Sequence, residues 1–118
     1  DESIASFEYG VSVLGVPLIV VLGHQSCGAV DATIKSIKEG TTLPGHLPSL
    51  VTALTPAVKA AMSEPGNLLD NAIRENVKMT VEKLKTATPI LASAVTEKKL
   101  RVVGGVYNLG SGKVELVG

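Results

Sequence analysis

Residues 17–30 read PLIVVLGHQSCGAV, and this stretch places one of two histidines and the only cysteine just after an apolar run. The run PLIVVLG has the length of a strand and is rich in β-branched residues, which is typical of a parallel strand covered on both faces. His24 and Cys27 fall where this predicted strand ends. Because open α/β folds bind ligands at the carboxyl edge of a parallel sheet, this junction is the first candidate site.

Helices are predicted on both sides of this strand, because apolar residues recur there at steps of three and four. Glycine and proline punctuate the segments, as at Gly40 after the second helix and at Pro65 and Gly66 after the third. The predicted helices span residues 3–14, 27–38, 50–62, 69–84 and, as a short turn, 89–95.

Two further strands are predicted at the end of the chain, LRVVGGVYNL (100–109) and KVELVG (113–118), and GSG between them is a hairpin signal. The order of elements predicts an α/β fold with a mostly parallel sheet, a C-terminal antiparallel hairpin and flanking helices. Three strands are few for a strand as apolar as PLIVVLG, which should have neighbours on both edges. We therefore expect the sheet to be incomplete, with a neighbouring strand missing.

Length and composition limit the function classes. A chain of 118 residues with 45% hydrophobic residues is expected to form a single domain over residues 1–118. Eleven basic residues balance eleven acidic ones, which argues against a nucleic-acid or anionic-membrane surface. One cysteine excludes an internal disulfide, no apolar run reaches the ~20 residues of a membrane span, and the acidic start lacks the basic head of a signal peptide. We expect a cytoplasmic protein.

Three interpretations of the spacing H-x-x-C are open from the residues alone. Imidazole and thiolate are both good Zn²⁺ ligands, and a turn between strand and helix can point both at one ion, with Gly23 and Gly28 permitting a tight turn and close approach. Single cysteines are also often simply buried. A Cys–His nucleophile pair is the third interpretation, although no residue that would orient the base can be named.

The stretch SIASFEYGVSVLGVPLIVVLGHQSCGAVDA (residues 3–32) closely resembles the β-class carbonic anhydrases, zinc enzymes that interconvert CO2 and bicarbonate. The family pattern G-H-x-x-C-G-A-V carries two zinc ligands, at the positions of His24 and Cys27 here. The resemblance continues through ENVKMTVEKLK and VVGGVYNLGSGKVELVG and so covers the whole chain. It implies Zn²⁺ as cofactor, CO2 and bicarbonate as ligands, and a homodimer or higher oligomer.

The resemblance also implies roles for two further residues and one departure. Gly28 would offer its backbone N–H to the substrate, and Tyr9 would line an apolar cleft at a dimer interface. Family members carry an upstream Cys-x-Asp-Ser-Arg motif, with a third zinc-ligating cysteine, that this sequence does not contain. We therefore expect an N-terminally truncated domain whose catalytic site is incomplete and whose zinc occupancy is doubtful. Carbonic anhydrase activity of the chain alone is expected to be absent or strongly impaired.

Two residues of the chain could complete the zinc site. They are His46, in the PGHLP loop, and Asp31, one helical turn beyond Cys27.

Other interpretations of the sequence also stay open. Tyr107 and Asn108 are interpreted as structural residues at a strand end and a turn. A non-catalytic assembly module that pairs through the unpaired strand edge is the alternative function, because exposed apolar edges recruit partners. A reactive thiol at Cys27 is a third hypothesis.

Overall fold

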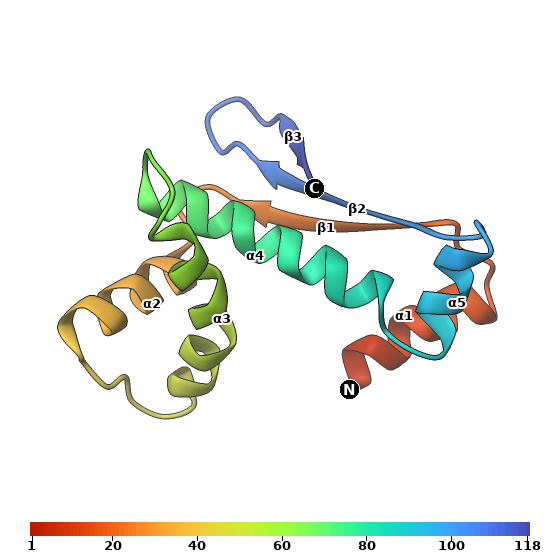
Figure 1. Cartoon of the computed structure of the whole chain (residues 1–118), viewed down its shortest axis with the longest axis horizontal. Helices are drawn as coiled ribbons and strands as arrows, with labels where there is room; N and C mark the ends of the chain where they lie inside the picture. The colour runs from red at the N-terminus through yellow and green to blue at the C-terminus, as the bar shows by residue number, and fades with distance from the viewer.

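Five helices and a three-stranded sheet make up the fold in the computed structural model, which describes residues 1–118 (Figure 1). The elements follow the predicted order, with ends within a few residues of those expected. They are α1 (Glu2–Ser12), β1 (Leu18–His24), α2 (Gly28–Glu39), α3 (Leu47–Ala61), α4 (Leu68–Lys85), α5 (Ile90–Thr96), β2 (Arg101–Tyr107) and β3 (Val114–Val117).

The sheet has the order β1-β2-β3. β1 runs parallel to β2, from Leu18 opposite Arg101 to His24 opposite Tyr107. β3 returns antiparallel to β2, with Val117 opposite Gly104. The α/β class, the parallel pairing and the C-terminal hairpin that the sequence predicts are therefore confirmed.

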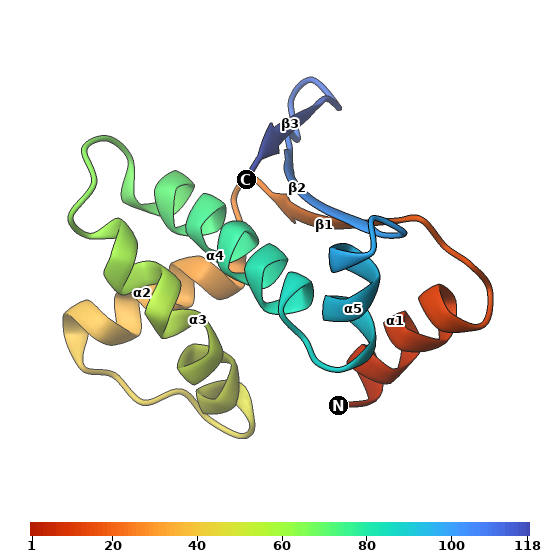
Figure 2. The same cartoon turned by 45° about the vertical axis from the view of Figure 1, so that its right-hand side comes forward.

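α4 covers one face of this sheet, and α2 and α3 pack beside it at one end, whereas α1 and α5 pair at the other end (Figures 1 and 2). The long helix comes close to the strands because glycines face it. A Cβ built on Gly23 would lie 2.7 Å from Cγ2 of Val77, and one built on Gly104 would lie 2.6 Å from Cγ1 of Val77. Gly23 thus serves helix packing and lies inside β1 rather than in the turn that follows it.

The core lies between α4 and its neighbours, and aliphatic side chains fill it because the chain has so few aromatic residues. Its most deeply buried large side chains are Leu91 and Val58, both 0% exposed. The buried cluster consists of Val30, Ile34, Leu54, Val58, Ala61, Ala72, Ile73, Val77, Val81, Leu84, Leu91, Ala94, Leu100, Val102 and Val106.

β1 is not covered on both faces, so that prediction was wrong. Its residues alternate between exposed and half-buried, and Leu18, Val20 and Leu22 are 47%, 49% and 55% exposed. The physical reason is that α4 shields only the face that carries Ile19, Val21 and Gly23. β1 also forms the edge of the sheet, with no strand on its outer side, as expected for an incomplete sheet. None of the helices has both the length and the apolar character needed to traverse a lipid bilayer.

Candidate metal centre

The turn between β1 and α2 carries the two residues that the sequence singles out. His24 is the last residue of β1, and Cys27 is the residue that precedes the first turn of α2. Gln25 and Ser26 form the turn between them, and Ser26, not a glycine, takes the positive φ of 56°. His24 and Cys27 therefore flank a short turn at the carboxyl edge of the parallel pair, where the sequence predicts the site.

Gln25 ties this turn to the β2–β3 hairpin. Its backbone N–H donates to the Tyr107 carbonyl at 3.0 Å, and its side-chain Oε1 accepts from the Leu109 N–H at 3.1 Å. Asn108 in turn accepts from the N–H groups of Gly110 and Ser111, both at 2.9 Å, which supports its interpretation as a turn residue. Sequence reasoning passed over Gln25. The only signal for it is its place inside the HQSC stretch.

The imidazole of His24 is exposed, and its Nδ1 lies 3.0 Å from the backbone carbonyl oxygen of Gln25. A carbonyl oxygen can only accept, so this hydrogen bond requires the proton on Nδ1. The neutral ring then has its free lone pair on Nε2. Metal-binding histidines commonly use this arrangement, in which a backbone carbonyl fixes one ring nitrogen and leaves the other for the ion.

Cys27 is a free, half-buried cysteine that packs against the edge of the core. Its carbonyl accepts the Asp31 N–H at 3.0 Å, which begins the hydrogen bonding of α2. The residue is only partly buried, unlike the residues of the core cluster.

Imidazole nitrogen and thiolate sulfur fit the donor chemistry of Zn²⁺, but a protein zinc site needs at least three such ligands. Nowhere does the structure gather three or more histidine, cysteine, aspartate or glutamate side chains into a group able to hold a metal ion. His46 and Asp31 therefore do not complete a cluster with His24 and Cys27. The chain supplies two residues that fit zinc and no third.

Asp31 is engaged elsewhere. Its Oδ2 lies 3.0 Å from Nζ of Lys35 one turn further along α2. The hydrogen bond from Lys35 to Asp31, together with the attraction between their charges, raises the pKa of Lys35 above its ordinary value. His46 lies at the start of α3 and is exposed.

The two residues with an expected substrate role lie at opposite ends of the sheet. Gly28 is the first residue of α2, adjacent to Cys27, and nothing lies within 4 Å of a Cβ built on it. Tyr9 is 58% exposed on α1, which packs against α5 at the far end of β1 (Figure 2). A Tyr9 that acts near His24 would therefore belong to a second copy, and its role stays a prediction.

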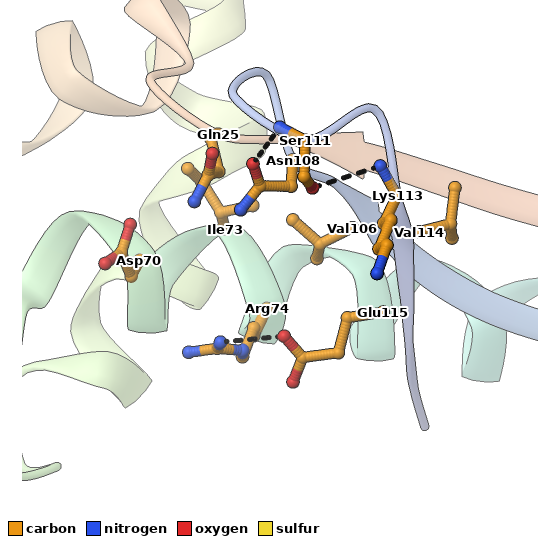
Figure 3. A pocket seen from close by; sticks show the side chains of 10 residues that line it. All are labelled: Gln25, Asp70, Ile73, Arg74, Val106, Asn108, Ser111, Lys113, Val114 and Glu115. Atoms are coloured by element: carbon orange, nitrogen blue, oxygen red, sulfur yellow. Dashed lines mark hydrogen bonds and ion pairs between the residues drawn. The ribbon is translucent and has the colours of Figure 1, made fainter.

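A polar cavity of about 350 Å³ opens beside the turn, between the start of α4 and the β2–β3 hairpin (Figure 3). Gln25 lines it from the turn, and Arg74 and Glu115 face each other across it with Nη2 and Oε2 at 3.3 Å. Lys113 and Asp70 add one further charge of each sign. The charges compensate one another, so the cavity offers no excess of positive charge to an anion.

Comparison with known proteins decides the family. The carbonic anhydrase family profile matches residues 1–114. The chain belongs to the β-class carbonic anhydrases. Carbonic anhydrases of Mycolicibacterium smegmatis and Pseudomonas aeruginosa are 37% identical over 113 residues and 38% identical over 116 residues, and these matches cover 96% and 94% of this chain.

Solved β-carbonic anhydrases share the fold. A tetrameric enzyme of the fungus Sordaria macrospora matches 99% of this chain with a TM-score of 0.83 at 22% identity, and the match covers 60% of that structure. The enzyme CafA of Aspergillus fumigatus matches 98% of this chain with a TM-score of 0.76 at 27% identity, and the match covers 55% of that structure. The chain spans about half the length of the relatives that it matches, 55% for M. smegmatis and 51% for P. aeruginosa.

Proposed function

We propose that this chain carries part of a β-class carbonic anhydrase centre, which converts CO2 and water reversibly into bicarbonate and a proton. The observation that carries the proposal is the pair His24 and Cys27, at the carboxyl edge of β1 in a chain that belongs to this family. When bound, zinc would supply a Lewis acid that makes water a nucleophile near neutral pH.

The residues of the chain have separate roles in this proposal. His24 would bind the ion through Nε2 while the Gln25 carbonyl holds Nδ1–H, and Cys27 would bind it as a thiolate. Gly28 would donate its N–H to an oxygen of the substrate, because N–H groups in the first turn of a helix have no partner within the helix. Tyr9 would line the apolar side of the cleft, from a second copy.

The proposal includes a low activity for the 118 residues alone. Two ligands hold zinc more weakly than three, so we expect low occupancy, and the third ligand would come from outside these residues. Homodimers or higher oligomers would fit the Tyr9 role, and the Sordaria relative is tetrameric. We also propose that residues 1–118 form a single domain, which the single buried cluster supports.

Metal binding tests the proposed ligands without relying on activity. Titration with Co²⁺ should produce thiolate-to-metal absorption in the parent chain and in His46→Ala, which alters the only other histidine. Cys27→Ser should abolish this absorption, and His24→Ala should weaken zinc binding at least about tenfold, since even changes outside the ligand set cost that much. Equal metal affinity in the parent and both ligand variants would refute the assignment.

Stopped-flow CO2 hydration with added zinc tests the expected impairment. We expect turnover by the isolated chain to lie far below the family's, and to fall further in His24→Ala. Turnover of the parent chain at the level of its relatives would contradict the expected impairment. The metal titration would then still test whether His24 and Cys27 bind the ion.

A further inference from the structure

Gln25 uses three polar groups to join the candidate ligand His24 to the β2–β3 hairpin. Its backbone N–H donates to the Tyr107 carbonyl at 3.0 Å, and its side-chain Oε1 accepts from the Leu109 N–H at 3.1 Å. Its backbone carbonyl oxygen lies 3.0 Å from Nδ1 of His24. One half-buried residue therefore connects the imidazole to two backbone groups at the end of β2 and just beyond it.

The side chain of Gln25 takes the place that its own carbonyl would have in the parallel ladder. Hydrogen bonds between parallel strands repeat every two residues along each strand. The bond from the Gln25 N–H to the Tyr107 carbonyl belongs to the ladder that pairs His24 with Tyr107. The next bond of that series would run from the Leu109 N–H to the Gln25 carbonyl. The Leu109 N–H is bonded to Oε1 instead, and the Gln25 carbonyl accepts from His24.

The hairpin loop holds the Leu109 N–H in place through its backbone. The Leu109 side chain is 57% exposed and does not anchor the loop. Asn108 does so, because its Oδ1 accepts from the N–H groups of Gly110 and Ser111, both at 2.9 Å (Figure 3). The Asn108 N–H also donates to the Lys113 carbonyl at 2.8 Å. The donor that faces Oε1 is therefore part of a loop with many internal hydrogen bonds.

We propose that Gln25 is a positioning residue for His24, an inference that rests on the proposed function. Its side chain occupies the Leu109 N–H, and this leaves the Gln25 carbonyl to hold the proton on Nδ1 of His24. The hydrogen bond at one ring nitrogen sets the tautomer, so Nε2 keeps the lone pair with which the ring would bind Zn²⁺. Gln25 acts through His24 and is not itself a ligand.

Loss of the Oε1 acceptor leaves the Leu109 N–H two other partners. It can bond to the Gln25 carbonyl, as the ladder predicts, and His24 then loses the acceptor of its Nδ1–H. It can bond to water instead, and the turn then loses one of its two hydrogen bonds to the hairpin. In both cases the Gln25 carbonyl holds the His24 ring less well, and the proton can move to Nε2.

The tautomer of His24 in the metal-free chain tests this role. Long-range proton–nitrogen NMR spectra distinguish the two neutral ring forms, and His46→Ala leaves His24 as the only histidine. At about pH 8.5, where imidazole is ordinarily neutral, the proton should lie on Nδ1. Gln25→Leu and Gln25→Ala lack the acceptor and should shift the ratio of the two forms about two- to tenfold toward Nε2–H. Gln25→Glu keeps an oxygen acceptor and should retain the parent form.

Hydrogen exchange at the Leu109 amide reports on the other end of the link. The amide should exchange about two- to tenfold faster in Gln25→Leu, the range that corresponds to one hydrogen bond, and at the parent rate in Gln25→Glu. Asp70→Ala is the matched control, because Asp70 lines the same polar cavity but is not bonded to the turn or the hairpin. It should change neither readout. Circular dichroism reports whether each variant is folded.

Cobalt titration extends the test to the ion. Gln25→Leu should raise the Co²⁺ dissociation constant about three- to tenfold, less than the loss of a direct partner of a ligand, which costs about 10–100-fold. A ring that keeps Nδ1–H in both Gln25→Leu and Gln25→Ala, or a Co²⁺ affinity equal to the parent's in both, would overturn the proposal. A parent chain without Co²⁺ binding would refute the proposed function instead, and the NMR spectra would still decide whether Gln25 sets the tautomer.

Discussion

Replacing Gly23 with alanine tests the reason that β1 can approach α4 just before the candidate ligand His24. A Cβ at this position would lie 2.7 Å from Cγ2 of Val77 and 3.4 Å from Cγ2 of Ile73. Val77 is 2% exposed and Ile73 is 3% exposed, so neither side chain can move into solvent. Helix and strand must therefore separate, or a buried side chain must leave its preferred rotamer.

The size of the effect follows from two opposing terms. Overpacking of this kind costs about 1–3 kcal/mol, and the lower chain entropy of alanine offsets about 0.5–1 kcal/mol of that cost. We therefore expect Gly23→Ala to lower the free energy of unfolding by about 1–2 kcal/mol and the melting temperature by about 5–10 °C. Gly28→Ala is the matched control, because nothing lies within 4 Å of its built Cβ.

A double-mutant cycle with Val77→Ala isolates the contact. Urea unfolding, followed by circular dichroism, gives the free energy of the parent, the two single variants and the double variant. Val77→Ala removes the methyl group that a Cβ at Gly23 would meet, so the double variant should be more stable than additivity predicts, by about 1 kcal/mol. A Gly23→Ala variant as stable as the parent, or additivity within about 0.3 kcal/mol, would refute the reasoning.

Three further predictions concern the core, an acidic pair and a surface ion pair. Leu91→Ala should lower the free energy of unfolding by about 2–5 kcal/mol in urea titrations, because Leu91 is 0% exposed. A loss below about 1 kcal/mol would contradict the placement of Leu91 in the core. A hydrogen bond to Glu75, together with burial and the repulsion between the two carboxylates, raises the pKa of Glu64 above its ordinary 4.5. Protonated Glu64 therefore stabilises the fold at pH values below 4.5, and this contribution is lost as the pH rises through the raised pKa of Glu64. The melting temperature should therefore fall between about pH 4 and about pH 7, and Glu64→Gln should remove the part of this fall that Glu64 causes. An unchanged pH profile of the melting temperature would count against the pair of Glu64 and Glu75. Arg74→Ala should cost less than about 1 kcal/mol in low salt and less still in high salt, because the 3.3 Å pair with Glu115 is exposed to solvent, and a larger, salt-insensitive loss would show that Arg74 has another role.

Local patterns predicted the elements of this fold well. The repeat of apolar residues at steps of three and four located α4 within one residue at each end, Leu68–Lys85 against the predicted 69–84. The third helix was placed at 50–62 but begins at Leu47, because Pro48 fits the first turn of a helix and does not break it. The errors in the predicted bounds lie at the ends of helices and strands, where capping interactions and side-chain packing compete.

The candidate site also has a part that the sequence predicts and a part that it does not. His24 and Cys27 were predictable because their positions depend on one strand, one turn and one helix that are continuous in the sequence. The bond from Leu109 to Gln25 was not, since it joins residues 84 positions apart. The distance of Tyr9 from the turn also depends on the packing of α1 against α5, which no local pattern encodes.

The sequence by itself determined the order of helices and strands, the HQSC turn and the likeness to β-class carbonic anhydrases. Only the tertiary structure decided that one face of β1 stays open and that Gly23 makes room for Val77. The physical reason is that backbone periodicity is a local property of the chain. Burial and strand pairing depend instead on which distant segments α4 and β2 bring against β1.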